Sequence, residues 1–292
     1  MGGLNMIRGL YSAASGLISQ QRRHDTITNN IANIETVGYK QKTTALSSFN
    51  EMLLQYTEPN TNTIKQIGTW TGNVFAEEAN TFFGQGDLVQ TNRKGDFALV
   101  SDIQVAGMQF NASGKNVAEN GEVTYQPQAY FTVRGEDNEV LYTRSGEFTT
   151  NAQGQLLTNA GEQVLGANGE PIVLPAGVSL DQLTLGGNGN LFTAAGEDTG
   201  IGFLISRVEN PNKLIRVGDG SYRLEEGETV EPIAAGENVA IMQNYIERSN
   251  VDYAQAQVEL MAAARAYEAN AQIIKYYDQS LSKAVNEIGK VQ

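Results

Sequence analysis

Apolar residues in the first part of the chain recur at alternating steps of three and four, the spacing of a heptad seam on a helix. The positions are Leu10, Ala13, Leu17, Gln20, His24, Ile27, Ile31 and Ile34. This pattern predicts one helix over roughly residues 6–36, ended by Gly38. Because the helix contains Asn29, Asn30 and Asn33, which are poor helix formers, we expect it to need a packing partner.

The last part of the chain carries a stricter repeat, in which a large apolar residue occurs at every seventh position. These residues are Tyr253, Leu260, Tyr267, Ile274, Leu281 and Ile288. The residues four positions after each of them are mostly small, which allows a second helix to approach closely. Ser249 or Asn250 is a suitable cap, and a helix from there to Ile288 is about 60 Å long at 1.5 Å per residue. Periodic runs of this length are typical of coiled coils or bundles.

The large residues of the two repeats form a predicted self-assembly surface, which we call the terminal seam. Its members are Leu10, Leu17, His24, Ile27, Ile31, Ile34, Tyr253, Leu260, Tyr267, Ile274, Leu281 and Ile288. Full burial of the C-terminal members would contribute a stabilising free energy on the order of 10 kcal/mol, whereas side chains left in water contribute none. We therefore expect the two ends to be mobile in a single chain and to become ordered when other copies cover them.

The middle of the chain alternates short β-type runs with turn signals, at the spacing expected of all-β folds. Residues 140–144 and 148–150 are predicted to form a hairpin across a Ser-Gly turn, and residues 155–158 continue the series after a further turn. Residues 57–69 are rich in Thr, Asn and Gln and are predicted to be a linker without regular structure. Residues 111–122 are predicted to be a polar loop or a hairpin tip.

The predicted fold class is α+β. Long N- and C-terminal helices form a coiled-coil-like bundle, and the middle domain is mainly antiparallel β, resembling a barrel or a sandwich. The predicted domains are an N-terminal helix with an extended segment (1–58), a polar linker (59–83), a β-rich middle domain (84–236) and a C-terminal helix (237–292). Charge follows the same division, because residues 59–236 hold 10 Lys and Arg against 22 Asp and Glu whereas both ends are nearly neutral.

Composition excludes several classes of function. The 292 residues carry 20 Lys and Arg against 33 Asp and Glu, a net charge of −13, so binding to nucleic acid is not expected. The absence of cysteine excludes disulfides and thiolate chemistry, and a single histidine, His24, excludes histidine triads and clusters. No stretch is long and apolar enough for a membrane span, and the N-terminus lacks the pattern of a cleaved signal peptide.

Candidate chemistry is weak. The segment 186–190 (Gly-Gly-Asn-Gly-Asn) superficially resembles a phosphate loop, but no helix pattern follows it, so a turn is the better interpretation. Acidic pairs such as Glu77-Glu78 and Glu225-Glu226 could in principle serve a glycosidase, but neighbouring side chains on a strand point to opposite faces. We therefore predict no catalytic residue, no metal ligand and no cofactor, and hence no enzyme.

Several motifs resemble those of one family, the bacterial flagellar rod and hook proteins. The N-terminal motif residues are Met6 to Tyr11, Asn29, Asn30, Asn33, Val37, Gly38, Tyr39 and Lys40. The C-terminal ones are Ser249, Asn250, Val251, Asp252, Arg265, Ala266, Tyr267 and Asn270. Central matches at residues 84–88 and 142–148 resemble the distal-rod branch, and further details are closest to a rod protein of Gram-positive bacteria.

The sequence departs from the family pattern at three places. Residues 1–5 precede the usual start, Ala264 stands where the family has glutamine, and the segment from about residue 100 to 128 is longer than the usual glycine-containing passage. These differences affect the expected shape of the middle domain more than the end helices.

The resemblance implies a structural subunit that is exported unfolded by the flagellar export apparatus and polymerises helically into a hollow rod joining motor and hook. Its implied partners are other copies of the chain and neighbouring rod and hook proteins, and its implied location is the extracytoplasmic basal body. From the residues alone, two other classes remain open: a surface-exposed β binding module on a helical stalk, and an enzyme such as a wall-cutting hydrolase. Within the family, proximal rod, hook and hook-junction proteins share the same end motifs.

Overall fold

The computed structural model divides the chain into two compact units. Unit 1 comprises residues 1–31, 42–80 and 252–292, and unit 2 comprises residues 32–41 and 81–251. The residues that the structure describes are 2–48, 52–57, 64–70, 74–77, 79–111, 114–118, 123–175, 177–187, 189–218, 220–225, 227, 229–233 and 238–288.

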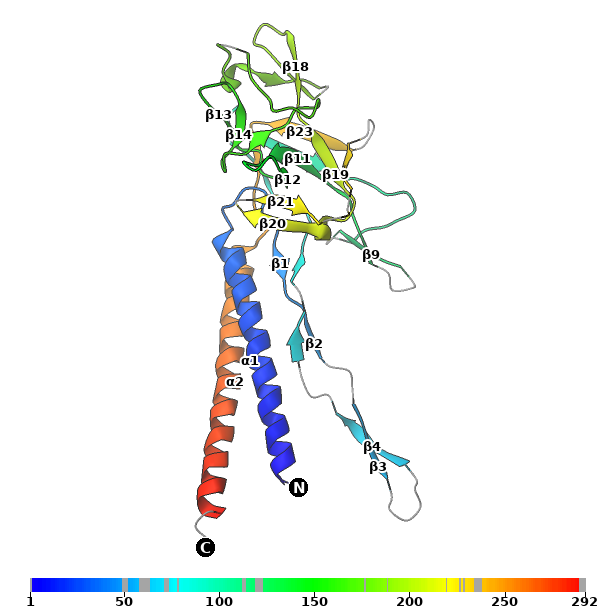
Figure 1. Cartoon of the computed structure of the whole chain (residues 1–292), viewed down its shortest axis with the longest axis vertical. Helices are drawn as coiled ribbons and strands as arrows, with labels where there is room; N and C mark the ends of the chain where they lie inside the picture. Colours follow the sequence, from blue (N-terminus) through cyan, green and yellow to red (C-terminus); the bar gives the residue numbers. More distant parts are fainter. Residues whose placement is uncertain are drawn as a thin grey trace. The chain divides into compact units, whose positions relative to one another are not determined.

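Unit 1 contains two long helices, α1 (Gly2–Ala32) and α2 (Tyr253–Ile288). They run side by side in opposite directions (Figure 1, blue and orange to red). Both predicted helices are therefore confirmed, although α1 begins and ends earlier than predicted, so that Ile34 of the terminal seam lies in the turn after it. Within the described part of the chain, neither helix is long and apolar enough to cross a membrane.

Small residues set the contact between the two helices. A Cβ atom added to Gly9 would overlap the ring and hydroxyl of Tyr277, and one added to Gly16 would lie 3.1 Å from Nδ2 of Asn270. Gly9 and Gly16 are seven residues apart on α1, and Asn270 and Tyr277 are seven residues apart on α2. The contact therefore follows one line along each helix. The coiled-coil geometry predicted for this pair stays a prediction, since these contacts establish only that the helices touch.

The cap of α2 differs from the predicted one. The Oδ1 atom of Asp252 accepts a hydrogen bond from the backbone N–H of Gln255 at 3.0 Å, so Asp252 caps the helix and not Ser249 or Asn250. A capping oxygen must lie directly before the first turn to reach its free N–H groups, and only Asp252 does so here.

Short strands complete unit 1, and they pair as local antiparallel ribbons, β2 with β5 and β3 with β4. The strands are β1 (Lys42–Thr43), β2 (Leu46–Ser48), β3 (Met52–Thr57), β4 (Ile64–Trp70) and β5 (Val74–Ala76), with β6 (Asn80–Thr81) at the unit boundary. The expectation that residues 57–69 lack regular structure is wrong where β4 lies. Backbone hydrogen bonds make this ribbon, and they form regardless of the polar composition that suggested a linker.

The main sheet of unit 2 is antiparallel, with strand order β13-β14-β15-β11-β12-β21-β20. Strand β19 also pairs with β11, and β22 pairs with β19. The strands are β11 (Gln128–Arg134), β12 (Val140–Thr143), β13 (Phe148–Thr150), β14 (Leu156–Thr158), β15 (Gln163–Val164), β19 (Ile205–Val208), β20 (Leu214–Gly218), β21 (Ser221–Leu224) and β22 (Glu231–Pro232).

Smaller sheets surround the main one: β8 pairs with β23, β7 with β24, β9 with β10, and β17 with β16 and β18. Their bounds are β7 (Leu88–Gln90), β8 (Phe97–Ser101), β9 (Lys115–Val117), β10 (Val123–Tyr125), β16 (Thr184–Leu185), β17 (Asn190–Phe192), β18 (Asp198–Gly202), β23 (Val239–Gln243) and β24 (Tyr245–Glu247). Two 3₁₀ turns are Leu180–Gln182 and Pro211–Lys213. Strand β9 lies in the segment 111–122, predicted to be a loop or hairpin tip, and β10 follows that segment directly.

Four phenylalanine rings form the centre of the unit 2 core. Phe97, Phe131, Phe148 and Phe203 lie with ring centroids 4.8–5.9 Å apart, and aliphatic side chains from most of the strands surround them. The mainly β middle region is thus confirmed. The barrel expectation is wrong for the described strands, because β13 and β20 end the main sheet and do not pair with each other.

One predicted hairpin does not form. Strands β12 and β13 belong to the same sheet but do not pair, because β12 pairs with β11 and β21 while β13 pairs with β14. The chain between them lies instead against residues 95–97: the backbone N–H of Phe97 donates to the carbonyl of Gly146, and that of Phe148 donates to Gly95. A Cβ atom on Gly146 would overlap the Phe97 carbonyl, so the glycine serves this close crossing and not a tight turn.

Candidate functional site

A buried ion cluster occupies unit 2, and Glu247 is its centre. The Oε1 atom of Glu247 accepts hydrogen bonds from Nζ of Lys40 at 2.5 Å and from the backbone N–H of Gly86 at 2.9 Å. Its Oε2 atom accepts a hydrogen bond from Nε of Arg144 at 2.7 Å. All three charged residues are 4% exposed or less. The carboxylate is therefore satisfied by protein groups that come from three other parts of the chain.

The other hydrogen bonds donated by Arg144 and Lys40 go to backbone carbonyls and to one serine hydroxyl. Arg144 donates from Nη1 to the carbonyl of Ala129 at 2.6 Å and to Oγ of Ser101 at 3.0 Å, and from Nη2 to the carbonyl of Leu99 at 3.0 Å. Lys40 donates to the carbonyl of Gly84 at 2.9 Å. Two cations face one carboxylate, and these neutral acceptors compensate the excess positive charge.

The pKa values of the cluster reflect burial opposed by pairing. For Glu247, burial alone raises the pKa, but the charges of Arg144 and Lys40 and their hydrogen bonds outweigh it and lower the pKa to about 2. For Lys40, burial lowers the pKa to about 8, and the neighbouring Glu247 offsets only part of that effect. Glu247 is therefore firmly ionised near neutral pH, which suits a structural ion pair and not a proton donor.

Glycines allow the backbones to come close enough to build the cluster. Gly38 has φ +71°, and a Cβ atom there would lie 2.8 Å from the carbonyl carbon of Arg144. At Gly86 a Cβ atom would overlap the carbonyl oxygen of Arg248. A side chain at either position would push apart the segments that carry the charged groups.

Asn250 joins three segments beside the cluster. Its Oδ1 atom accepts a hydrogen bond from the backbone N–H of Gln41 at 2.7 Å, and its Nδ2 atom donates to the carbonyls of Phe82 at 2.9 Å and Gly84 at 3.0 Å. The side chain thus replaces the backbone pairing that two crossing strands would otherwise make. Ser249 and Val251 adjoin it, the second of them buried.

Tyr39 and Asn33 are held by a residue far along the chain. The guanidinium of Arg216 lies 4.9 Å from the centre of the Tyr39 ring, and its Nη2 atom donates to Oδ1 of Asn33 at 3.1 Å. Burial raises the pKa of the Tyr39 hydroxyl, and Arg216 opposes this rise. Unit 2 therefore fixes the segment that follows α1 at several points.

The motif residues of unit 1 have other roles. The side chain of Asn30 is buried and brackets the backbone of Lys42, donating from Nδ2 to its carbonyl at 2.7 Å and accepting from its N–H at 3.0 Å. Asn270 lies against Gly16, whereas Asn29 and Arg265 are exposed and Ala266 is half-buried. These motif residues belong to α1 and α2 of unit 1, whereas the residues of the ion cluster belong to unit 2.

The terminal seam is only partly covered in the single chain. Ile27 is buried, whereas Leu10, Leu17, His24, Ile31 and Ile34 are half-buried. On α2 the half-buried seam residues are Leu260, Ile274 and Leu281, and the exposed ones are Tyr253 and Tyr267. The Ile288 side chain lies outside the described part of the structure. Whether these residues mediate assembly stays a prediction.

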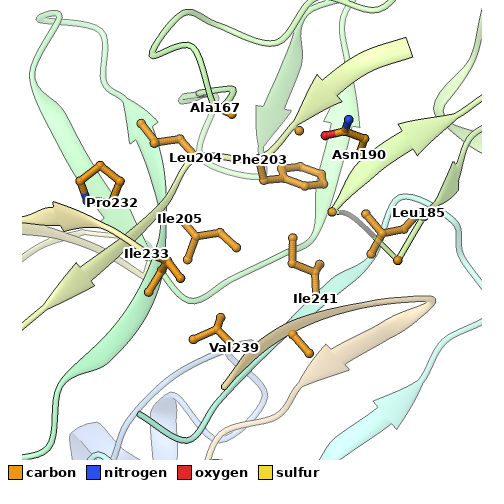
Figure 2. A pocket seen from close by; sticks show the side chains of 15 residues that line it. Ala167, Leu185, Asn190, Phe203, Leu204, Ile205, Pro232, Ile233, Val239 and Ile241 are labelled. Carbon is orange, nitrogen blue, oxygen red and sulfur yellow. The ribbon is translucent and has the colours of Figure 1, made fainter. Parts of the chain in front are cut away.

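An apolar groove of about 580 Å³ also lies in unit 2, beside β16 and β23 (Figure 2). Leu185, Phe203, Ile205, Ile233 and Ile241 are among the side chains that line it. None of its described lining residues is ionisable, so the groove offers no acid or base for catalysis. Gly186, Gly187 and Gly189 at its rim lie between β16 and β17, and the Gly186 N–H donates to the Asn190 carbonyl at 2.8 Å, in agreement with the predicted turn.

Three family models match consecutive parts of this chain. They are described as flagella basal body rod protein (residues 10–40), flagellar hook protein FlgE/F/G D1 domain (126–196) and flagellar basal body rod FlgEFG protein C-terminal (242–287). The flagellar hook-basal body complex protein FlhO of Bacillus subtilis is 33% identical over 299 residues, which cover 98% of this chain and 100% of that protein. The chain belongs to the flagellar basal-body rod and hook protein family.

Other family members align over almost their whole length too. The flagellar basal-body rod protein FlgG of Borreliella burgdorferi is 27% identical, covering 96% of this chain and 98% of its own length. FlgG of Bacillus subtilis is 28% identical, covering 96% and 99%. The resemblance inferred from the motifs is thus confirmed. These relatives are named as rod and hook-basal body proteins and not as enzymes, in agreement with the prediction that this chain is not an enzyme.

The ion cluster draws one charged residue from each family-model match. Lys40 ends the first match, Arg144 lies in the second and Glu247 lies in the third. Lys40 and Arg144 lie inside the family motifs but had no predicted role, and Glu247 was not among the predicted site residues. The sequence did carry a signal for these residues. Arg144 directly follows the apolar residues of β12, and Glu247 is the last residue of β24. A charged residue next to a buried strand needs a partner of opposite charge.

Proposed function

We propose that this chain is a structural subunit of the flagellar basal-body rod and that it polymerises through its terminal helices. The observation that carries this proposal is the amount of apolar surface that α2 leaves uncovered. Tyr253, Val258, Met261 and Tyr276 are each 51–65% exposed. Apolar patches of this kind mark interaction surfaces, and in a family of rod proteins the natural occupant is another subunit.

The ion cluster supports a mechanical role within that subunit. The segment 38–41 leads out of α1 and the segment 247–251 leads into α2, and Lys40, Glu247 and Asn250 tie both of them to the β sheets of unit 2. Force carried by either helix therefore enters unit 2 at a place held by buried charge-assisted hydrogen bonds. This arrangement suits a subunit of a rotating shaft.

The rest of the assignment follows the family. The proposed location is the extracytoplasmic part of the basal body, reached by export of the unfolded chain through the flagellar channel. The proposed partners are other copies of the chain, neighbouring rod and hook proteins and the export apparatus. The acidity of residues 59–236 would keep free subunits apart by repulsion before assembly. Distal rod is the proposed position, on the central motif match.

Deletion and complementation test the proposal. A strain without the gene should fail to swim, and the full chain supplied in trans should restore swimming. Leu260→Asp or Ile274→Asp should abolish restoration, because a carboxylate on the terminal seam opposes burial, while unit 2 stays folded. Val217→Asp is the matched control, since Val217 is an exposed apolar residue of unit 2. A seam variant that restores swimming fully would contradict the seam, and a deletion strain that swims would contradict the function.

Limited proteolysis tests the proposed three-part organisation of the chain, a helical end, a β-rich middle and a second helical end. A resistant fragment covering about residues 70–240 that has lost both ends would support it. Resistance of the full chain would contradict it.

A further inference from the structure

Helix α2 carries a second apolar face, which the seven-residue repeat does not include. We call it the outer stripe, and its residues are Val258, Met261, Arg265, Ala269, Ile273 and Tyr276. They follow one another at steps of three and four, so they lie on one face of the helix. All of them are exposed, and the four large apolar residues among them range from 43% for Ile273 to 65% for Tyr276. Arg265 carries a positive charge on this face, and Gln272, three residues after Ala269 and four before Tyr276, is a second exposed polar residue on it.

The other apolar surface is shared by the two helices. We call it the seam edge, and its residues are Leu10, Leu17, Leu260, Tyr267, Ile274 and Leu281. The two helices touch along a line through Gly9 and Gly16 on α1 and through Asn270 and Tyr277 on α2. Leu10 and Leu17 come one residue after the two glycines, and Ile274 and Leu281 come four residues after Asn270 and Tyr277. Both rows are therefore rotated away from the contact line in the same sense about their own helix axis. In an antiparallel pair, equal senses of displacement fall on the same side, so the two rows form one surface.

A negative charge accompanies the seam edge. Asp278 lies four residues after Ile274 and three before Leu281, which places it on the same face of α2. Asp278 and Arg265 are both exposed, and among the described residues neither side chain has an ion pair or hydrogen bond. Each of the two apolar surfaces thus presents one charge, opposite in sign to that of the other, and neither charge has a partner in the part of the chain that the structure describes.

A polymer needs two different surfaces on every subunit. If the outer stripe met another outer stripe, the contact would be symmetric and would close as a dimer. A stripe that meets a different surface leaves one of each free at the ends, so the chain of subunits continues. The outer stripe and the seam edge satisfy this requirement because they occupy different faces of α2.

We infer that the outer stripe of one subunit docks on the seam edge of a second copy and that Arg265 of the first pairs with Asp278 of the second. This inference rests on the proposed function and specifies its interface. Arg265 and Asp278 are 13 positions apart in α2, so two parallel helices joined in this way are displaced by about 20 Å along their axes. The pairing also gives a role to Arg265, a motif residue whose side chain makes no ion pair or hydrogen bond with the residues that the structure describes.

Charge exchange tests the pairing in a deletion strain complemented with the full chain. Arg265→Asp and Asp278→Arg should each abolish swimming, because each places two like charges in the interface, and the double variant should restore it. The control combines Arg265→Asp with Glu136→Arg, an exposed acid of unit 2 that belongs to neither surface, and should not restore it. Normal swimming of Arg265→Asp, or a double variant no better than the single ones, would overturn the pairing. Restoration by the unchanged chain shows separately that the proposed function stands.

Disulfide trapping tests the same contact directly, because the chain has no cysteine of its own. A chain carrying both Arg265→Cys and Asp278→Cys should give a ladder of covalent multimers when isolated basal bodies are oxidised. Each single variant should give no ladder, and neither should the pair Arg265→Cys with Glu136→Cys, because Glu136 is an exposed residue of unit 2 outside both surfaces. A ladder from the control pair, or none from the test pair in assembled basal bodies, would refute the proposed register.

Discussion

The Oε2 atom of Glu247 accepts a hydrogen bond from Nε of Arg144 at 2.7 Å, and both residues are almost completely shielded from solvent. The two residues are 103 positions apart in the sequence. This contact, completed by Lys40, joins all three family-model matches of the chain at one point. Transfer of both charges out of water costs free energy, and the loss of one partner costs more because it leaves a buried charge without compensation.

Removal of the central charge should therefore destabilise unit 2 strongly. Glu247→Gln leaves Arg144 and Lys40 as buried cations without a carboxylate, and we expect a loss of about 3–5 kcal/mol in the free energy of unfolding. Urea unfolding of the purified chain measures it. Glu225→Gln is the control, because Glu225 pairs with Lys213 at 2.8 Å in an exposed position, where a loss of about 1 kcal/mol or less is expected. Equal losses in the two variants would contradict a special role of the cluster.

Stability should fall in acid within a defined range of pH. The pKa of Glu247 is about 2 in the folded chain and 4.5 for an ordinary glutamate, so the folded state holds this proton less tightly than the unfolded state. The stabilisation from Glu247 is therefore complete above about pH 4.5 and is lost as the pH falls towards 2, an effect on the order of 3 kcal/mol. Unfolding free energies measured across this range should fall less steeply for Glu247→Gln. Parallel curves would refute the assignment.

The helix pair should depend on the absence of a side chain at Gly9. Replacing a helical glycine by alanine normally stabilises a helix by about 1 kcal/mol, but here the new methyl group overlaps Tyr277. We expect Gly9→Ala to increase the hydrogen exchange of α1, and to decrease it in a Tyr277→Ala background. Gly16→Ala should have a smaller effect, because its neighbour is the movable amide of Asn270. An unchanged sign in the two backgrounds would contradict the close contact.

Asn250 should tolerate neither truncation nor charge. Asn250→Ala removes three hydrogen bonds and leaves the Gln41 N–H without its acceptor, so we expect a loss of about 2–4 kcal/mol in the free energy of unfolding. Asn250→Asp keeps an acceptor for Gln41 but places a carboxylate against two carbonyl oxygens, so it should be no more stable than the alanine variant. Thermal or urea unfolding distinguishes these outcomes. Full stability of Asn250→Asp would show that the donated bonds are unimportant.

Periodicity in the sequence was enough to predict both long helices, but not which face of each helix packs against the other. The repeat was read from large residues such as Leu17 and Leu260, whereas the contact is built on Gly9 and Gly16. Large residues identify the surface that gains most from burial, and small residues identify where two backbones can approach. In a single chain the close approach determines the pairing, and the large residues stay half-covered at its edge.

The middle of the chain illustrates the limit of local signals. The Ser-Gly pair before Phe148 has the composition of a hairpin turn, yet Gly146 lies against Phe97 and the two flanking strands do not pair. Turn composition reports what a short segment can adopt. Which neighbour it finally pairs with depends on residues that only the folded sheet brings near.

By itself, the sequence determined the class of the protein: helical ends, a β-rich and acidic middle, and motifs that identify the family. These properties depend on spacing and composition along the chain, which are local. Only the tertiary structure decided that Lys40, Arg144 and Glu247 meet, because Lys40 and Glu247 lie 207 positions apart and their attraction matters only where water is excluded. The fold excludes water around these three residues, and their structural role follows from that exclusion.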